Sequence, residues 1–388
     1  MNPFIPLSIP NFIGNELKYV TDAVQAGWVS TGGAYITKFE QVVSEYLHSA
    51  GAVACQSGTA GIHTGLMVMG VTSEDAVLVP TLTFIAAVNP VMYVNAEPIF
   101  MDCDDSLCMD PVKLKLFCEE ECDFRNGQLI SKNSGRHIKA IIVVHVFGNM
   151  ADMESIMAVA AMYNLLVLED ATEALGTYYS SGKFKGKYAG TIGDLGVYSF
   201  NGNKIITTGG GGMLVSDNLK YLQHARHLTT QAKSDELYYT HDEIGYNYRM
   251  TNLQAALGVA QLEQLEHFIQ IKTENFKQYQ NSLAQDGIHL LTYRDNIRSN
   301  HWFYALDTAG LCLDRDSLIA YLASKGIQTR PVWGLIHEQK PYNNKEVYKI
   351  EKAKVFWQKV INIPCSTSLT KSDIEYVTNV LKQINRDE

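Results

Sequence analysis

Short apolar runs alternate with amphipathic segments between residues 14 and 216. The segments carry apolar residues at helical spacing, and the runs between them hold few polar residues. Strands that are apolar on both faces are buried on both sides, so the pattern predicts an α/β fold with a mainly parallel sheet. The expected strands are residues 52–56, 76–80, 98–102, 138–146 and 165–169, with an antiparallel return at 211–216; the expected helices are 14–26, 36–49, 59–69, 84–94 and 153–163.

The pattern changes near residue 250. A long helical pattern over 252–283 predicts a connecting helix, and apolar residues over 300–306 precede helices expected at 315–325 and 371–384. This order predicts a smaller α+β domain. We therefore expect a large domain over 1–250 and a second domain over 251–388.

Composition narrows the class of protein. The chain has 388 residues, of which 46% are hydrophobic and 19% charged, with a net charge of −9. These values are typical of a globular protein, and the lack of a basic run argues against nucleic acid as a partner. The first residues lack the charged start and the apolar run of a signal peptide. No stretch reaches the about 18 apolar residues that span a membrane. We therefore expect a cytoplasmic protein with no membrane partner.

Seven cysteines raise the question of a metal site. Cys103, Cys108, Cys118 and Cys122 are close in sequence, but they lack the Cys-x-x-Cys pairs of common zinc sites. Reduced thiols are the favoured interpretation and zinc the alternative, so we expect no metal.

Asp170 and Lys204 are the most informative pair. Asp170 ends the apolar run Leu165–Asp170, and Lys204 lies in a predicted turn before the glycines 209–212. An acid at a buried strand end and a lysine in a nearby turn are what pyridoxal 5′-phosphate requires, because the lysine binds the cofactor and the acid keeps its pyridine nitrogen protonated. The alternative is an α/β protein with a surface lysine and a helix-capping aspartate.

Other residues can complete a cofactor site. Gly58 and Thr59 stand at a strand-to-helix junction, where free N–H groups suit a phosphate, although the same motif serves as a helix cap. Ser199 can donate to that phosphate or simply shape a turn. Phe84 can stack on a flat ring or belong to the core.

Asn247 and Arg249 lie among tyrosines in 245–252, a composition typical of anion contact, with a solvated turn as the alternative. No Gly-x-Gly-x-x-Gly follows the first strand, and no Lys-Ser/Thr follows the glycines 209–212. The first absence argues against a Rossmann dinucleotide site, and the second shows that the glycine run is not a P-loop.

With these residues in place, the chain resembles the DegT/DnrJ/EryC1/StrS sugar aminotransferases over essentially its whole length. The resemblance is carried by motifs at 27–32, 39–40, 57–60, 83–86, 146–149, 169–174, 198–200 and 245–249. It implies fold type I of the pyridoxal phosphate enzymes, with a mainly parallel seven-stranded sheet and a smaller C-terminal domain. The runs 199–208 and 245–249 look most like the bacillosamine/legionaminic-acid branch, which aminates C4 of a UDP-linked 2-acetamido-4-keto-6-deoxy sugar.

The resemblance also implies roles for single residues. Lys204 would carry the cofactor and shuttle a proton, and Asp170 would pair with the pyridine nitrogen. Glu173 stands where many members have His or Gln. Asn247 would reach the phosphate of a second subunit, which implies a homodimer with shared sites. Phosphate, ring and substrate contacts would come from Gly58, Thr59, Ser199, Phe84, Asn201, Asn203, Arg249 and His337.

The expected reaction transfers the amino group of glutamate to C4 of the keto sugar. A dTDP- or GDP-linked sugar is the alternative substrate. A related dehydratase would replace the lysine with histidine, and a non-catalytic regulator could lose the lysine or the acid, whereas this chain keeps Lys204 and Asp170.

Overall fold

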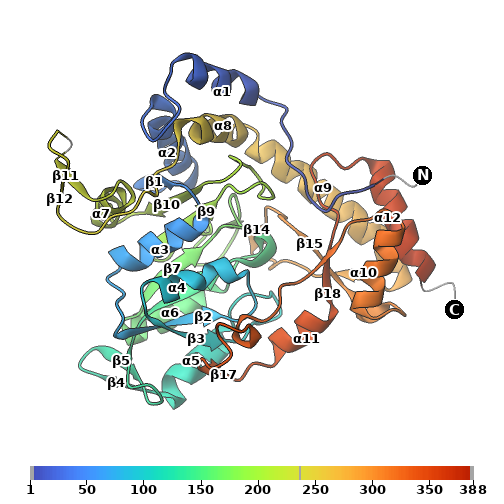
Figure 1. Ribbon diagram of the computed structural model, residues 1–388. Coiled ribbons are helices and arrows are strands. Elements are labelled where there is room, and N and C mark those ends of the chain that lie inside the picture. Colours follow the sequence, from blue (N-terminus) through green and yellow to red (C-terminus); the bar gives the residue numbers. More distant parts are fainter. Residues whose placement is uncertain (1–3, 236, 385–388) are drawn as a thin grey trace.

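The computed structural model describes residues 4–235 and 237–384, and a ten-stranded sheet lies at its centre (Figure 1). Eight strands follow one another across this sheet, and a hairpin joins it at β6. In spatial order the strands are β1 (Gly51–Cys55), β10 (Gly212–Ser216), β9 (Leu195–Ser199), β7 (Leu166–Asp170), β6 (His137–Val144), β2 (Asp75–Pro80), β3 (Glu97–Met101) and β17 (Val347–Tyr348), and the hairpin is β4 (Cys122–Arg125) with β5 (Gln128–Ser131).

The sheet is mainly parallel, as the sequence predicts. Strands β9, β7, β6, β2 and β3 pair in parallel, and β10 runs antiparallel to both β9 and β1. The expected seven strands become ten because β17 and the β4–β5 hairpin are added to them. β17 has two residues and β4 is mostly exposed, so neither has the buried apolar run that identifies a central strand.

Helices cover the sheet, and glycines allow one of them to lie very close. These helices are α3 (Gly58–Val68), α4 (Asn89–Tyr93), α5 (Pro111–Glu120), α6 (Met153–Tyr163) and α7 (Leu219–Thr229). On α3, a Cβ at Gly61 would lie 2.7 Å from Val197, and a Cβ at Gly65 would lie 2.7 Å from Leu168. The two glycines therefore bring α3 down onto β9 and β7, the strands that carry the candidate site.

Two predicted helices are broken. Residues 84–94 form a 3-10 helix, η1 (Ile85–Ala87), followed by α4, in whose first turn Pro90 lacks an N–H for a continuing helix. Residues 252–283 form α8 (Asn252–Leu262) and α9 (Leu265–Leu283). At that break Glu263 accepts hydrogen bonds from Asn15 and Tyr19, both at 2.8 Å, which are contacts that the helical pattern does not encode.

The N-terminal helices α1 (Glu16–Gln25) and α2 (Ala34–Leu47) pack against α8. Outside the large sheet, two short pairs are formed by β8 (Tyr178–Tyr179) with β14 (Ile297–Arg298), and by β11 (Lys233–Asp235) with β12 (Thr240–His241). No helix in the described part of the chain is long and apolar enough to span a membrane.

The C-terminal part has its own antiparallel sheet of four strands, in the order β13 (His289–Leu290), β15 (Tyr304–Asp307), β18 (Val360–Ile363) and β16 (Arg330–Pro331). Its helices are α10 (Arg315–Ser324), α11 (Lys352–Lys359) and α12 (Lys371–Ile384). The chain start also joins this part, because Ile5 forms a bridge with Ile327 and Leu7 accepts the Cys365 N–H at 2.8 Å.

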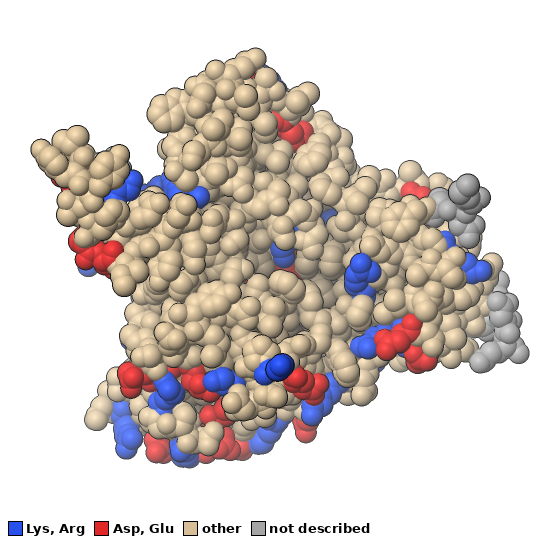
Figure 2. Space-filling model, viewed as in Figure 1, with Lys and Arg blue, Asp and Glu red and all other residues tan. Residues whose placement is uncertain are grey.

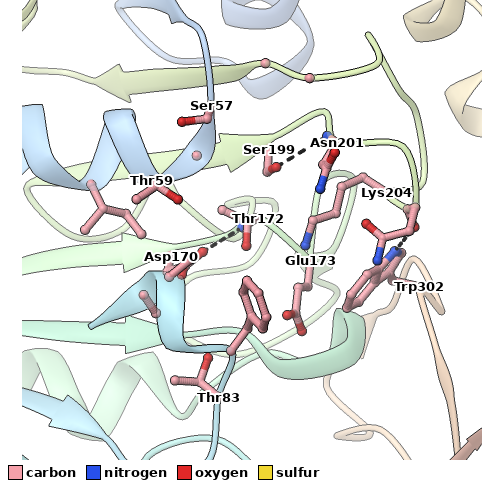
Figure 3. A pocket seen from close by; sticks show the side chains of 18 of the residues that line it. Ser57, Thr59, Thr83, Asp170, Thr172, Glu173, Ser199, Asn201, Lys204 and Trp302 are labelled. Atoms are coloured by element: carbon pink, nitrogen blue, oxygen red, sulfur yellow. Dashed lines mark hydrogen bonds between the residues drawn. The ribbon is translucent and has the colours of Figure 1, made fainter. Parts of the chain in front are cut away.

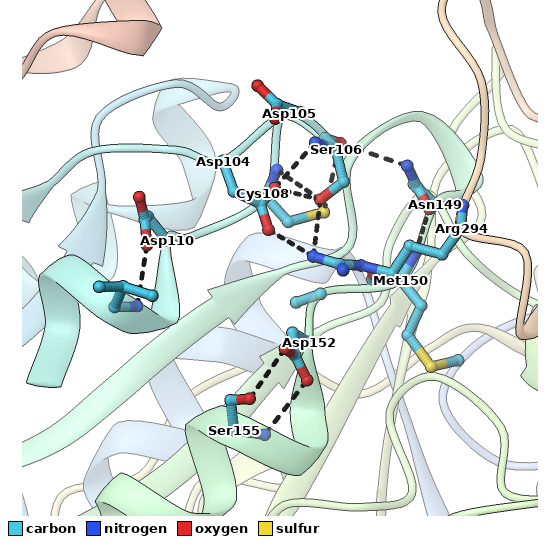
Figure 4. A network of polar contacts seen from close by, with 12 residues as sticks. Asp104, Asp105, Ser106, Cys108, Asp110, Asn149, Met150, Asp152, Ser155 and Arg294 are labelled. Atoms are coloured by element: carbon cyan, nitrogen blue, oxygen red, sulfur yellow. Dashed lines mark hydrogen bonds and ion pairs between the residues drawn. The ribbon is translucent and has the colours of Figure 1, made fainter. Parts of the chain in front are cut away.

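A polar network ties the C-terminal part to the large sheet (Figure 4). Arg294 forms an ion pair with Asp104, contacts the Ser106 hydroxyl at 3.2 Å and donates to the Met150 carbonyl at 2.8 Å. Asp104 and Ser106 follow the carboxyl end of β3, and Met150 follows that of β6. The network therefore places the C-terminal part at the edge of the sheet where parallel strands end.

Candidate active site

A cavity of about 340 Å³ opens at the carboxyl ends of β7 and β9, where α/β proteins commonly bind ligands (Figure 3). The first turn of α3 forms one side of it. Trp302, Phe303 and Trp333 of the C-terminal part line the other side. The cavity thus lies between the two parts of the chain.

Most of the residues predicted for the site line this cavity. Asn247, Arg249 and His337 do not. The predicted residues that the fold brings together are Gly58, Thr59, Phe84, Asp170, Glu173, Ser199, Asn201, Asn203 and Lys204.

Lys204 enters the cavity from the turn between β9 and β10. Its backbone N–H donates to the Asn201 carbonyl at 3.0 Å, and its side-chain Nζ lies 4.2 Å from the centre of the Trp302 ring. Burial lowers the pKa of Lys204, and the nearby carboxylates of Glu173 and Asp170 oppose that shift. A lysine in such surroundings keeps a larger neutral fraction, which is the form that acts as a nucleophile or base.

Asp170 and Glu173 are buried acids on the same segment. Asp170 ends β7 and accepts the Thr172 N–H at 3.0 Å, and burial raises its pKa. Glu173 accepts the Phe147 N–H at 2.8 Å, and burial raises its pKa while Lys204 opposes the rise. Phe147 has a φ of 55°, a strained value for a residue with a side chain, and this conformation accompanies its hydrogen bond to Glu173.

The first turn of α3 is suited to an anion. The Ser57 hydroxyl caps the helix by accepting the Ala60 N–H at 3.0 Å, and Gly58 and Thr59 begin the helix at the cavity wall. A Cβ at Gly58 would lie 3.0 Å from Thr172 and 3.1 Å from Ser199, so a side chain there would crowd the cradle. N–H groups of a helix start together with the Thr59 and Ser199 hydroxyls are a suitable donor set for a phosphate.

These observations fit pyridoxal 5′-phosphate. Phe84 is 54% exposed and lines the cavity, so it is an accessible aromatic wall rather than a core residue. A phosphate cradle, an aromatic wall, a buried acid and a lysine amine therefore surround one space. These are the groups that this cofactor needs for its phosphate, its ring, its pyridine nitrogen and its covalent attachment.

The three residues outside the cavity have other surroundings in this chain. Arg249 forms an ion pair with buried Glu40, so its guanidinium is not turned to the cavity. His337 contacts the Thr81 hydroxyl through Nδ1 at 2.6 Å. Asn247 is exposed on the loop after β12, so a contact with its own cavity is not formed.

Several cavity residues were not predicted for the site. Thr172 lies two residues after Asp170, and its N–H bond to that acid depends on the turn after β7. Trp302 and Phe303 belong to a run that the pattern identifies only as apolar. Trp333 follows residues 330–332 and belongs to no motif that identifies a cofactor site. Only the docking of the C-terminal part brings these aromatic residues to the site.

Six cysteines are buried free thiols, and Cys312 is exposed; the six are Cys55, Cys103, Cys108, Cys118, Cys122 and Cys365. Burial raises the pKa of Cys108 and Cys122 to about 12, so these thiols are poor metal ligands and poor nucleophiles at neutral pH. Within the described ranges no group of three or more His, Cys, Asp or Glu residues has the arrangement of a metal site.

Fold and site together define a pyridoxal phosphate-dependent aminotransferase of the α/β type. The model of the DegT/DnrJ/EryC1/StrS aminotransferase family matches residues 10–382, and the chain belongs to this family. It is thus a sugar aminotransferase that uses pyridoxal 5′-phosphate.

Similar proteins cover the whole length. GDP-perosamine synthase of Escherichia coli O157:H7 is 36% identical over 99% of this chain and 100% of its own. EpsN of Bacillus subtilis (strain 168) is 35% identical over 98% and 96%. The crystal structure of a DegT DnrJ EryC1 StrS aminotransferase from Brucella abortus is 25% identical, with a TM-score of 0.86 and 95% of each chain covered. None of these names specifies the bacillosamine/legionaminic-acid branch, which stays a prediction.

Proposed function

We propose that this protein transfers the amino group of glutamate to C4 of a nucleotide-linked 4-keto-6-deoxy sugar. The observation that carries the proposal is the Lys204 amine, which lies in one cavity with two buried acids and a phosphate cradle. Bound pyridoxal 5′-phosphate supplies an electron sink that stabilises negative charge on the carbon next to the substrate nitrogen.

The side chains divide the work in this proposal. Lys204 would hold the cofactor and, as a free amine, would move a proton at the substrate carbon. Asp170 would pair with the pyridine nitrogen. Gly58, Thr59 and Ser199 would hold the phosphate, and Phe84 would cover the ring. Glu173 lies close enough to Lys204 to influence its pKa, so this acid takes part in setting the fraction of Lys204 that carries a proton.

Two candidate substrates are considered, and a different observation supports each of them. The run 199–208 favours a UDP-linked sugar with a 2-acetamido group, and Asn201 and Asn203 line the cavity as neutral hydrogen-bonding groups. The names of the most similar relatives favour a GDP-linked sugar instead. A site built to bond an acetamido group discriminates strongly against a sugar without one, because its polar groups would be left unpaired.

A substrate panel tests both levels of the proposal. The enzyme is given glutamate and a UDP-2-acetamido-, GDP- or dTDP-linked 4-keto-6-deoxy sugar, and the aminated product is measured by mass spectrometry. We expect kcat/KM for one nucleotide class to exceed the others by at least about 100-fold. Preference for the GDP sugar would overturn the UDP assignment alone, whereas no amination of any 4-keto sugar would overturn the proposed reaction. Lys204→Ala is the control for background amination.

We further propose a homodimer in which Asn247 completes the partner's site. Figure 2 shows that most charged side chains on this face lie around α5, β4, β5 and β17, and that few are visible around α1 and α2. Leu17 and Val24 on α1 and Trp28 after it are strongly exposed. A surface with these exposed apolar side chains and few charges on the visible face suits a second copy.

Hybrid dimers test the shared site. Lys204→Ala and Asn247→Ala are each expected to be inactive, but a hybrid dimer has one site with both intact residues. Equal mixing should restore roughly a quarter of wild-type activity. A monomer in sedimentation, or no recovery when subunit exchange is demonstrated, would contradict the proposal.

A further inference from the structure

Trp302 contacts the catalytic turn in two ways (Figure 3). The centre of its ring lies 4.2 Å from Nζ of Lys204, and its Nε1–H donates to the Asn203 carbonyl at 2.7 Å. Asn203 directly precedes Lys204 in the chain. The indole is therefore bonded to the backbone that carries the amine, and its face lies against that amine.

Trp302 is itself held firmly. Its backbone N–H donates to the Asn300 side chain at 2.9 Å, and its backbone carbonyl accepts from the buried Lys272 amine at 2.9 Å. Its ring stacks on Phe303. The Asn300 side chain also donates to the Glu173 carbonyl at 3.0 Å. The ring is thereby positioned relative to Lys204 and to the segment that carries the two acids.

An aromatic face suits an amine that changes its charge during turnover. The face of an indole carries partial negative charge and attracts an ammonium group, but it accepts no proton. The charged groups that face Lys204 are Glu173 and Asp170, and both can take up protons. A ring beside them stabilises the ammonium without competing for its proton.

We propose that Trp302 is a positioning residue for Lys204. Its ring face holds the amine whenever the lysine is not bonded to the cofactor, and its indole Nε1–H fixes the turn from which the lysine extends. This inference rests on the role of Lys204 in the proposed function.

The test measures the charge state of Lys204 in the full-length protein loaded with pyridoxamine 5′-phosphate, to which the lysine is not bonded. Acetic anhydride labels only neutral amines, and mass spectrometry quantifies the label on Lys204 across a range of pH. In Trp302→Leu we expect the labelling midpoint to move down by about 0.4 to 1.5 pH units, because the ammonium loses the aromatic face. Trp302→Phe keeps an aromatic face, so its shift should be less than half as large, while its kcat should fall several-fold because the Asn203 carbonyl loses its donor.

Two controls keep the test decisive. Trp333→Phe alters another tryptophan of the cavity and should leave the midpoint in place. If Trp302→Leu does not fold, all tryptophans are replaced by 5-fluorotryptophan, which keeps the shape and the N–H but weakens the negative charge of the aromatic face. This replacement should lower the labelling midpoint of Lys204 in the wild type. It should not lower that midpoint in Trp302→Phe. A midpoint that stays in place on loss or fluorination of Trp302, or that moves equally in Trp333→Phe, overturns the proposal.

Failure of the underlying function is recognised separately. The enzyme with bound pyridoxal 5′-phosphate is reduced with borohydride, and the modified lysine is located by mass spectrometry. Attachment at a lysine other than Lys204 would overturn the role of Lys204 itself. Attachment at Lys204 with an unmoved midpoint would overturn only the role of Trp302.

Discussion

Lys272 and Lys204 are both removed from bulk water, but their amines have different surroundings. The Lys272 amine lies inside the C-terminal part and donates to the carbonyls of Trp302 at 2.9 Å and Cys365 at 2.5 Å. The Lys204 amine faces a cavity, with two acids and an aromatic ring around it.

Burial lowers the pKa of both lysines, so a lowered pKa does not by itself identify a catalytic group. The difference lies in what the amine can reach. Lys272, on α9, is bonded to backbone carbonyls just before β15 and just after β18. Lys204 has open space before it, in which a cofactor can be bound. Four predictions test this comparison, from the largest expected effect to the smallest.

Lys204→Ala should abolish turnover while the fold remains. General acid–base catalysis alone accounts for a factor on the order of 10²–10⁴, and loss of cofactor attachment adds to it. The measurements are steady-state kinetics and urea unfolding, and the free energy of unfolding should change by less than about 1 kcal/mol because the amine faces a cavity. Turnover near the wild-type rate would remove Lys204 from the mechanism.

Asp170→Asn should slow the chemistry more than it weakens cofactor binding. The amide cannot stabilise a protonated pyridine nitrogen, so the first half-reaction with glutamate should slow on the order of 10²-fold. The phosphate cradle is unchanged, and the Kd for pyridoxal 5′-phosphate should rise less than about tenfold. Stopped-flow absorbance and a binding titration give the two values. An unchanged half-reaction would show that the acid has another role.

Lys272→Ala should give the opposite result to Lys204→Ala. It leaves two buried carbonyls without this donor and opens a void, and each of these effects costs about 1–3 kcal/mol. We expect the free energy of unfolding to fall by about 3 kcal/mol in urea titrations, whereas borohydride reduction should still attach the cofactor at Lys204. An equally stable variant would mean that the buried amine does not support the packing.

Glu173→Gln should change how stability depends on pH. Burial raises the pKa of Glu173 in the folded protein, so the folded state holds this proton more tightly than the unfolded state. Stability contributed by this group is present at low pH and is lost as the pH rises from the ordinary carboxyl range through the raised value. The variant should therefore gain stability relative to the cofactor-free wild type across that window.

Urea unfolding at several pH values between about 4 and 9 measures this difference. Asp170 has a pKa that burial also raises, and it is present in both proteins, so its effect largely cancels. A difference between the two proteins that stays constant with pH would show that Glu173 titrates normally.

Much of the fold and part of the site could be predicted from local sequence. Buried parallel strands show themselves as continuous apolar runs, and Asp170 and Gly58 stand at strand or helix ends that such runs locate. The antiparallel return at β10 also follows from the turn around Lys204. In each case the signal and the structure involve residues close together in the chain.

The sequence by itself determined the mainly parallel sheet, the cofactor class and part of the cavity lining, including Gly58, Asp170 and Lys204. Only the tertiary structure decided that Trp302 would lie against Lys204 and that Arg249 would pair with Glu40. It also separated Lys204 from Lys272, because the surroundings of a buried amine come from segments remote in sequence: Lys272 meets carbonyls 30 and 93 residues away. Local patterns record which face of an element is buried, but they do not record what that face is buried against.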